Sequence, residues 1–260
     1  MSEPKNNPML QVENLAKRFG GIVATDDLAL SVAANELHAV IGPNGAGKTT
    51  LIAQLSGQLT PDSGRIRFAG RDITTLPMYR RSRLGLARSF QITSLFLDLS
   101  VLDNVALAAQ AHAGHSFHFW RDARREAELR QPARAALARV GLAERAELPA
   151  SLLSHGEHRL LELAMALAAS PRMLLLDEPM AGLGPEESAR MVDMLRALKR
   201  ELTILLVEHD MEAVFALADR ITVLDYGRVI ASGNPDDIRA NAQVREAYLG
   251  EAELEGAPHG

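Results

Sequence analysis

Three short apolar runs stand out along the chain, and segments with apolar residues at helical spacing lie between them. The runs are Leu37–Ile41, Met173–Leu176 and Thr203–Val207. A strand buried on both faces gives such an uninterrupted run, as in the parallel sheets of α/β proteins. The helical segments carry their apolar residues at Leu51, Ile52, Leu55 and Leu59; at Leu160, Leu161, Ala164 and Leu167; and at Met191, Leu195, Leu198 and Leu202. Strands and helices alternating in this way predict an α/β fold around a parallel sheet.

The segments near the two ends of the chain follow another pattern. Leu10–Val12 and Leu28–Val32 are short strand-like runs on either side of a turn at Gly20-Gly21, and Arg65–Phe68 alternates polar and apolar residues. These patterns predict short strands, the last of them half exposed. Residues 221–224 and 228–231 flank Asp225-Tyr226-Gly227 and predict a hairpin.

A helical insertion is predicted between the first and second apolar runs. Ser100 followed by Asp103 is typical of a helix N-terminus, and the helix would continue to Ala113. Pro132 suits the first position of a second helix, which Gly141 would end.

Two further segments, one before this insertion and one within it, carry a cluster of basic residues and a cluster of aromatic residues. The arginines of the basic segment 73–83 are expected to form a solvated face. The cluster Phe117, Phe119 and Trp120 either packs on the core of the insertion or forms a docking face for a partner, and the first interpretation is the simpler one.

Composition restricts the function without defining it. The 260 residues, 47% of them hydrophobic, suffice for a full core, and the formal net charge of −5 argues against a general nucleic-acid binder. There is no cysteine, which excludes disulfides and thiolate nucleophiles. Met1–Pro8 carries no apolar segment typical of a secretory signal, and no stretch approaches the roughly 20 apolar residues of a spanning helix.

The candidate chemistry begins directly after the first apolar run. A complete match to G-x-x-x-x-G-K-[ST] lies between this strand and a helix, as a phosphate-binding P-loop requires. The matching residues are Gly42, Pro43, Asn44, Gly45, Ala46, Gly47, Lys48, Thr49 and Thr50. Backbone N–H groups of such a loop and the helix dipole bind phosphate, Lys48 would reach the β- and γ-phosphates, and Thr49 would hold Mg²⁺.

Polar residues also follow the other predicted strands. Gln91 ends a strand-like segment from Leu86, Asp177 and Glu178 end the second apolar run, and His209 comes shortly after the third. Ligands of open parallel sheets bind at the carboxyl ends of the strands, so we expect these residues to converge on one nucleotide. Asp177 would hold Mg²⁺ and Glu178 would activate water as a general base.

These motifs together resemble the nucleotide-binding subunits of ATP-binding-cassette (ABC) transporters over nearly the whole chain. The resemblance identifies residues 42–49 as Walker A, Met173–Asp177 as Walker B, Glu178 as the catalytic glutamate, Gln91 as the Q-loop, His209 as the switch histidine and Phe19 as the base-stacking A-loop aromatic. By itself Phe19 would be taken for a core aromatic, and His209 for a surface or capping histidine.

The family signature and D-loop depart from their usual patterns. Ser154-His155-Gly156-Glu157 matches the end of Leu-Ser-Gly-Gly-Gln, with histidine at its third position and glutamate at its fifth. Because Ser154 and Gly156 are kept, the resemblance still implies γ-phosphate binding by this helix N-terminus. In Ala181-Gly182-Leu183-Gly184 the usual aspartate at the fourth position is missing.

The resemblance implies a fold, partners and a location. We expect a P-loop NTPase (RecA-like) core at 1–91 and 153–235 with an N-terminal antiparallel β subdomain, an inserted helical subdomain at 92–152, and a C-terminal extension with a flexible tail at 236–260. Two such subunits, in a homo- or heterodimer, would enclose two molecules of ATP with Mg²⁺. Permease subunits would dock near Gln91 and the helical subdomain, on the cytoplasmic side of a bacterial inner membrane, and a solute-binding protein would participate indirectly.

The transported solute is suggested by shorter similarities. Residues 88–105, 176–183, 207–211 and 247–251 resemble importers of branched-chain amino acids. Related subunits serve urea and short-amide uptake or lipopolysaccharide export. Two other classes remain: a small-molecule P-loop kinase, which needs no signature or second carboxylate strand, and a cassette protein acting on ribosomes or DNA, which usually carries two cassettes or long insertions.

Overall fold

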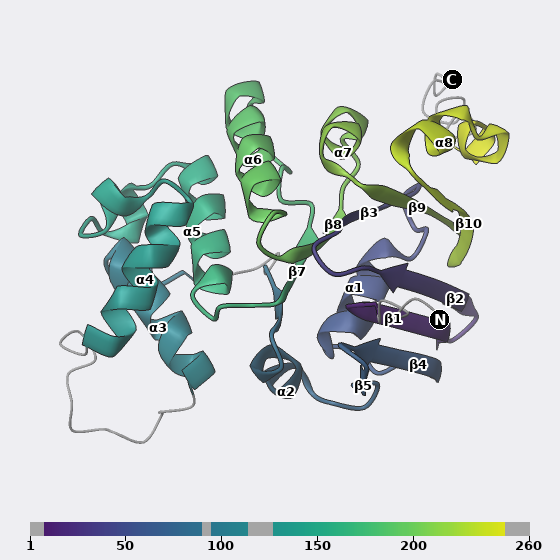
Figure 1. The fold of residues 1–260 in the computed structure, drawn as a ribbon, viewed down its shortest axis with the longest axis horizontal. Helices are drawn as coiled ribbons and strands as arrows, with labels where there is room; N and C mark the ends of the chain where they lie inside the picture. Colours follow the sequence, from purple (N-terminus) through teal and green to yellow (C-terminus); the bar gives the residue numbers. More distant parts are fainter. Residues whose placement is uncertain (1–7, 90–94, 114–126, 248–260) are drawn as a thin grey trace, which may run out of the picture.

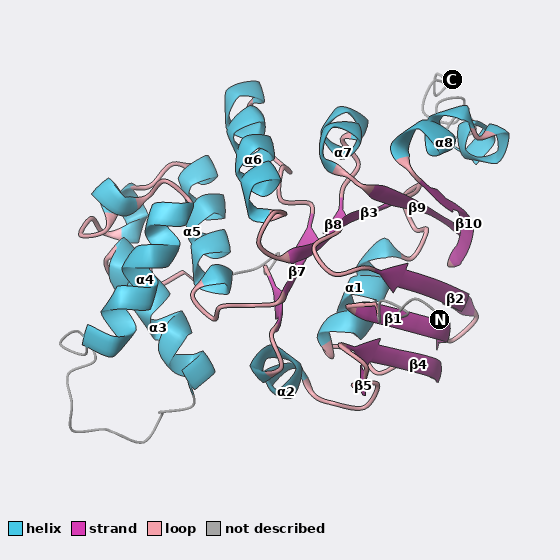
Figure 2. Cartoon of the chain, in the orientation of Figure 1, coloured by secondary structure: helices cyan, strands magenta, loops and turns pink. Residues whose placement is uncertain are grey.

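The computed structural model describes residues 8–89, 95–113 and 127–247. In this part of the chain the strands form two sheets (Figures 1 and 2). The larger has the order β10-β9-β3-β8-β7-β6, and its neighbours are parallel except for β9 and β10. Its strands are β3 (Leu37–Ile41), β6 (Leu86–Arg88), β7 (Met173–Asp177), β8 (Thr203–Val207), β9 (Arg220–Asp225) and β10 (Arg228–Gly233).

The second sheet is antiparallel and has the order β2-β1-β4-β5. Its strands are β1 (Leu10–Phe19), β2 (Ile22–Val32), β4 (Ser63–Phe68) and β5 (Arg71–Asp72). The predicted N-terminal antiparallel strands and their turn at Gly20-Gly21 are confirmed, although β1 and β2 are much longer than the apolar runs indicated. The extra length is partly exposed, so it carries no continuous apolar signal.

The helices are α1 (Lys48–Ser56), α2 (Met78–Arg83), α3 (Val101–Ala113), α4 (Ala127–Arg139), α5 (His155–Leu167), α6 (Pro185–Leu198), α7 (Met211–Leu217) and α8 (Pro235–Ala240), with 3₁₀ turns at Ala143–Arg145 and Ala150–Leu152. Helix α1 lies between the two sheets, while α6 and α7 cover the other face of the larger sheet (Figure 1). This arrangement confirms the predicted α/β class.

Burial on both faces explains the uninterrupted apolar runs. In β7, Met173 and Leu175 pack with α1 and the small sheet, whereas Leu174 and Leu176 pack with the helices of the opposite face. Successive side chains of a strand alternate between faces. Since both faces of β7 are covered, every position from 173 to 177 is buried and the chain is apolar up to Asp177.

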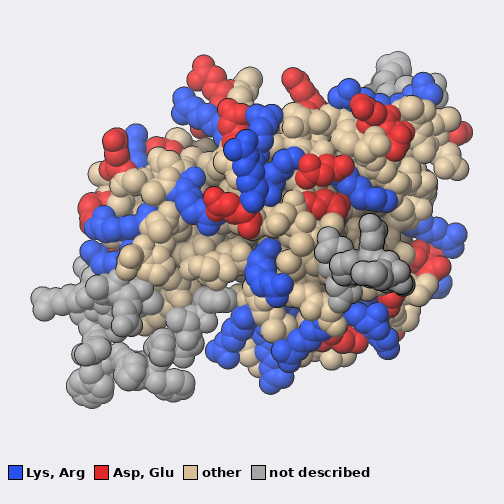
Figure 3. Space-filling view, viewed as in Figure 1, with Lys and Arg blue, Asp and Glu red and all other residues tan. Residues whose placement is uncertain are grey.

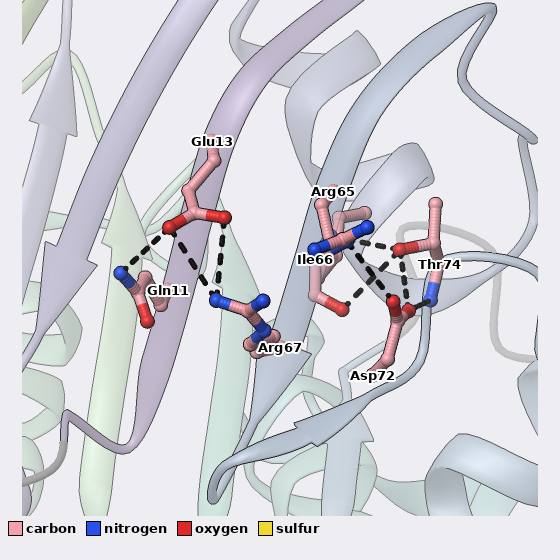
Figure 4. Close-up of polar contacts among 7 residues, drawn as sticks. All are labelled: Gln11, Glu13, Arg65, Ile66, Arg67, Asp72 and Thr74. Carbon is pink, nitrogen blue, oxygen red and sulfur yellow. Dashed lines mark hydrogen bonds and ion pairs between the residues drawn. The ribbon is translucent and has the colours of Figure 1, made fainter.

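The small sheet is polar on its outer face. Figure 4 shows Arg67 donating to the Glu13 carboxylate at 3.3 and 3.4 Å, and Gln11 donating to the same carboxylate at 3.0 Å. Asp72 accepts from the Thr74 hydroxyl at 2.7 Å and pairs with Arg65 at 3.3 Å. The neighbouring positions on each strand, such as Val12 and Ile66, are buried. This alternation is the period-two pattern of a sheet with one solvated face.

Helices α3, α4 and α5 gather at one side of the larger sheet, where α5 contacts β6 (Figure 2). The prediction that Pro132 begins a helix is wrong, because Pro132 lies inside α4. An interior proline costs about 3 kcal/mol. The stripe Ala133, Ala136, Leu137 and Val140 is buried at helical spacing, and its packing outweighs that cost. The predicted start of α3 is confirmed, with the Ser100 hydroxyl accepting from the Asp103 N–H at 3.0 Å.

The expectation of a solvated arginine face at 73–83 is wrong for Arg81. Arg80 and Arg83 are exposed, and Figure 3 shows basic side chains on this part of the surface, but Arg81 is only 1% exposed. Its guanidinium donates to the carbonyls of Gln54, Leu55, Leu76 and Thr74 at 2.7–2.9 Å. Burial lowers the pKa of Arg81 to about 10, so the side chain remains charged at neutral pH.

The charge of Arg81 stabilises the C-terminal end of α1. Gln54 and Leu55 belong to the last turn of that helix, where carbonyl groups lack helical partners and the dipole is negative. Arg81 satisfies two of these carbonyls with a cation. The helix that carries Lys48 at its N-terminus is therefore anchored at its C-terminus by a side chain from α2.

Candidate nucleotide site

The glycine-rich loop joins β3 to α1 and requires glycine at two positions. Gly42 has φ +151°, and a Cβ there would lie 2.1 Å from the Leu224 carbonyl oxygen. Gly47 has φ +101°, and its Cβ would lie 2.2 Å from the Ala24 carbonyl oxygen. Any side chain at either position would therefore collide with backbone. The loop is held between β2 and the β9–β10 turn, whose Gly227 N–H donates to the Ala46 carbonyl at 3.0 Å.

Lys48 is buried inside this loop. Its Nζ donates to the carbonyl oxygens of Gly42 and, at 2.8 Å, Pro43, so the ammonium lies within the curve of the loop. Thr49, the next residue, is exposed at the N-terminus of α1. One end of α1 therefore carries an ammonium group, the N–H groups of a helix N-terminus and a hydroxyl group. These are the groups that bind polyphosphates in proteins.

The order of the parallel strands brings the predicted polar residues to one edge of the sheet. Strands β3, β8 and β7 are neighbours in parallel register, and they end at Ile41, Val207 and Asp177. Gly42, Glu178 and His209 follow these ends directly or within two residues. Gln91, and likewise the cluster Phe117, Phe119 and Trp120 and the tail beyond 247, lie outside the described residues.

Asp177 has a partner that the sequence analysis did not find. Arg88, the last residue of β6, donates to the Asp177 carboxylate at 3.0 Å, and the two side chains are 9% and 2% exposed. Burial raises the pKa of the Asp177 carboxyl, and the Arg88 charge opposes that rise. The only sequence signal was an arginine at the end of a strand-like segment, which is not specific.

Glu178 occupies a constrained position beside His209. Its φ is +49°, a left-handed conformation that is unfavourable for a residue with a side chain. The Glu178 N–H donates to the Val207 carbonyl at 2.9 Å, which ties the turn to β8. The Glu178 Oε1 lies 3.9 Å from His209 Nδ1, and the His209 side chain is 66% exposed. The two predicted catalytic side chains are thus adjacent at an open edge of the sheet.

Glu208 holds the two neighbouring turns together. This carboxylate is 1% exposed and accepts from the Met180 N–H at 3.0 Å and from the His209 N–H at 2.9 Å. It therefore links the turn after β7 to the turn after β8. The sequence showed only an acidic residue before His209, and no spacing rule singles it out.

The signature segment begins α5 with a reciprocal cap. Ser154 Oγ accepts from the Glu157 N–H at 3.2 Å, and the Ser154 N–H donates to the Glu157 carboxylate at 2.8 Å. Glu157 also pairs with Arg145 at 3.3 Å. Serine followed three residues later by glutamate is the capping-box pattern. The glutamate that departs from the usual signature thus has a local role, which the sequence could have revealed.

Within the same chain, Gly156 faces the first turn of α6 and His155 faces the turn after β7. A Cβ at Gly156 would lie 2.3 Å from the Glu187 Oε1, and a Cβ at Gly182 would lie 3.2 Å from the His155 Nε2. The Glu187 carboxylate also accepts from the Gly184 N–H at the start of α6, at 3.3 Å. The signature helix is therefore in contact with the D-loop segment and the start of α6, and a side chain at Gly156 would displace the Glu187 carboxylate.

Phe19 is at the end of β1 and is not a core residue. Its side chain is 49% exposed, and the Lys17 ammonium lies 5.8 Å from the ring centre. An exposed aromatic ring is available to stack on a base.

The oxygen atoms at this site suit a hard cation that is bound partly by the protein and partly by the phosphates of a substrate. The described residues contain no group of three or more His, Asp and Glu side chains that would bind a metal by themselves. Mg²⁺ is typically held by one or two protein oxygens together with substrate phosphates and water. The Thr49 hydroxyl and the Asp177 carboxylate are oxygen donors of this kind. In the same part of the chain, no helix has the length and apolar character needed to cross a membrane.

Known proteins resemble this chain over nearly its whole length. Residues 25–181 match the family model "ABC transporter", and residues 228–253 match "Branched-chain amino acid ATP-binding cassette transporter". The chain is 39% identical over 254 residues to the high-affinity branched-chain amino acid transport ATP-binding protein BraF of Pseudomonas aeruginosa, covering 95% of this chain and 100% of the relative. It is 38% identical over 259 residues to LivG of Escherichia coli K12, with the same coverage.

Solved structures show the same fold. A nucleotide-free ATP-binding cassette of an ABC transporter matches with a TM-score of 0.83 and 30% identity, over 93% of this chain and 98% of that one. An ABC transporter cassette in its ADP conformation matches with the same TM-score and identity, over 94% and 99%. These similarities confirm the predicted ABC ATPase fold. The chain therefore belongs to the ABC transporter family, as one of the ATP-binding subunits that hydrolyse ATP to power transport.

Proposed function

We propose that this subunit powers the uptake of branched-chain amino acids, using the edge of the sheet where Lys48, Asp177, Glu178 and His209 meet. That convergence carries the catalytic part of the proposal. The choice of solute is supported by the C-terminal match at 228–253 and by the names of relatives that align over their whole length. The alternatives of urea, short-amide or lipopolysaccharide transport have no such support here.

The residues have separate roles in hydrolysis. The loop N–H groups and Lys48 bind the β- and γ-phosphates, and Phe19 stacks on the base. Thr49 and Asp177 would hold Mg²⁺, which would neutralise phosphate charge. Glu178 accepts the proton of the attacking water, and His209 at 3.9 Å orients Glu178 and contacts the γ-phosphate. Gln91 would add a further contact to the metal and the water.

A second subunit completes each site in this proposal. Ser154 and Gly156 of one subunit would bind the γ-phosphate held by Lys48 of its homo- or heteromeric partner. Permease subunits would dock near Gln91 and the helical subdomain predicted at 92–152, on the cytoplasmic side of the membrane, and receive solute from a binding protein. In the structure α5, beyond the predicted boundary at 152, packs against α3 and α4.

Lys48→Ala tests the site and the solute together. We expect loss of measurable ATP affinity and of leucine uptake by cells that carry the chain with its permease and binding-protein genes, because the lysine is the cation of the phosphate loop. Circular dichroism should show a folded variant. Isotope uptake of leucine and urea distinguishes the solutes: uptake of urea without leucine by the wild type would contradict the branched-chain proposal, and wild-type turnover in Lys48→Ala would contradict the site.

The proposed role of Gly156 across the dimer can be tested in variants that lack the Glu187 side chain of the same subunit. A Cβ at Gly156 would meet the flexible end of the Glu187 side chain, so Glu187→Ala serves as the background, in which Gly156→Ala should retain hydrolysis. Gly156→Asp with Glu187→Ala should be inactive while binding ATP normally, since the added carboxylate would repel the γ-phosphate across the dimer. ATP binding by calorimetry and phosphate release are measured on each. Full hydrolysis by the last variant would contradict the role of Gly156 across the dimer.

A further inference from the structure

Arg88 is buried between two parts of the nucleotide site. Its Nη2 donates to the Asp177 Oδ2 at 3.0 Å, and its Nη1 donates to the Gln58 Oε1 at 2.7 Å. Gln58 lies two residues beyond α1, the helix whose other end carries Lys48 and Thr49. One planar guanidinium therefore connects the carboxylate at the end of β7 to the C-terminal side of the phosphate-loop helix.

The backbone fixes where this guanidinium lies. Arg88 is opposite Leu175 in the parallel ladder of β6 and β7, and the Ser89 N–H donates to the Leu175 carbonyl at 3.0 Å. With only 9% of the side chain exposed, Arg88 has little freedom to swing away. Arginine is suited to this position because its donors are set in a rigid fork, so two acceptors are held in a fixed relation.

We propose that Arg88 is a positioning residue for the metal-binding carboxylate. By holding Oδ2 of Asp177, it orients the carboxylate and leaves the remaining oxygen for Mg²⁺ or for a water bound to it. The inference rests on the proposed role of Asp177 in metal binding. Partners that orient a metal ligand typically contribute about 10- to 100-fold to metal affinity or activity.

If the ion pair between Arg88 and Asp177 only stabilised the fold, its loss would have different effects. Loss of a structural pair would lower stability and affect binding of ATP with and without metal alike. A positioning residue affects the metal-dependent part alone. The experiment therefore measures metal binding directly, by titrating Mn²⁺ followed by electron paramagnetic resonance in the presence of a non-hydrolysable ATP analogue, and measures affinity for the same analogue in EDTA.

The variants are Arg88→Gln, Arg88→Lys and Asp177→Asn, with the exposed Arg83→Gln as the matched control. Arg88→Gln should weaken Mn²⁺ binding by about 10- to 100-fold with metal-free affinity unchanged. Arg88→Lys keeps the charge opposite Asp177 but loses the fork, so it should fold and show an intermediate loss. Thermal unfolding is recorded for all of them, and Arg83→Gln should match the wild type.

The outcomes separate the two proposals. Wild-type Mn²⁺ affinity in a folded Arg88→Gln or Arg88→Lys variant would overturn the positioning role, and so would an equal loss of metal-free affinity. If Asp177→Asn itself binds Mn²⁺ like the wild type, the metal role proposed for Asp177 fails. A loss in Asp177→Asn without a loss in the Arg88 variants removes the Arg88 inference alone.

Discussion

Glu178→Gln is expected to bind ATP with Mg²⁺ and to lose hydrolysis by about 10²- to 10⁴-fold, the usual contribution of a positioned general base. Glutamine keeps the shape of the side chain but does not accept the proton of the attacking water. The turn itself should be unaffected, because its left-handed conformation is held by the backbone bond from the Glu178 N–H to the Val207 carbonyl.

A subunit that binds ATP without hydrolysing it should also change its oligomeric state. In the proposed dimer, ATP that is bound and not hydrolysed would hold the two signature helices against the two phosphate loops, so Glu178→Gln should elute as a dimer with ATP and as a monomer without it. Size-exclusion chromatography and phosphate release are measured on the same preparation. Glu186→Gln, an exposed carboxylate on α6, makes the same charge change and should hydrolyse ATP normally. Normal turnover in Glu178→Gln would show that another group activates the water.

The largest effect on stability is expected for Arg81→Met. This change keeps the aliphatic stem and removes the guanidinium, which takes a donor from the carbonyls of Gln54, Leu55, Leu76 and Thr74, of which Gln54 keeps the Gly57 N–H at 3.3 Å. Unsatisfied buried acceptors cost about 1–3 kcal/mol each before relaxation, so we expect the free energy of unfolding to fall by about 3–5 kcal/mol.

The neighbouring arginine provides the control. Arg80→Met lies one residue away on α2 and is exposed, so its free energy of unfolding should stay within about 0.5 kcal/mol of the wild type. Urea denaturation followed by circular dichroism gives both values. Equal stabilities of the two variants would show that water replaces the guanidinium at the end of α1, and the anchoring role of Arg81 would be wrong.

Most of the fold and of the nucleotide site could be predicted because the patterns that indicate them lie within short, continuous stretches of sequence. A buried strand, a glycine loop and a helix start lie within a dozen positions around Lys48, and the two carboxylates follow an apolar run directly. Periodicity therefore located the central strands, α1, α5 and α6. The rule that ligands bind at the carboxyl ends of parallel strands then placed Asp177, Glu178 and His209 at one edge.

The tertiary structure decided what depends on contacts between distant segments. Arg81 and Arg80 are the same residue type in the same helix, and only the packing of α2 on the end of α1 buries one of them. Pro132 lies inside α4 because a buried stripe beside it outweighs its local preference. Gly156 faces Glu187, and Arg88 faces Asp177, across 31 and 89 positions of sequence. A sequence pattern records what a residue prefers, whereas burial and charge pairing depend on which other segment the fold brings against it.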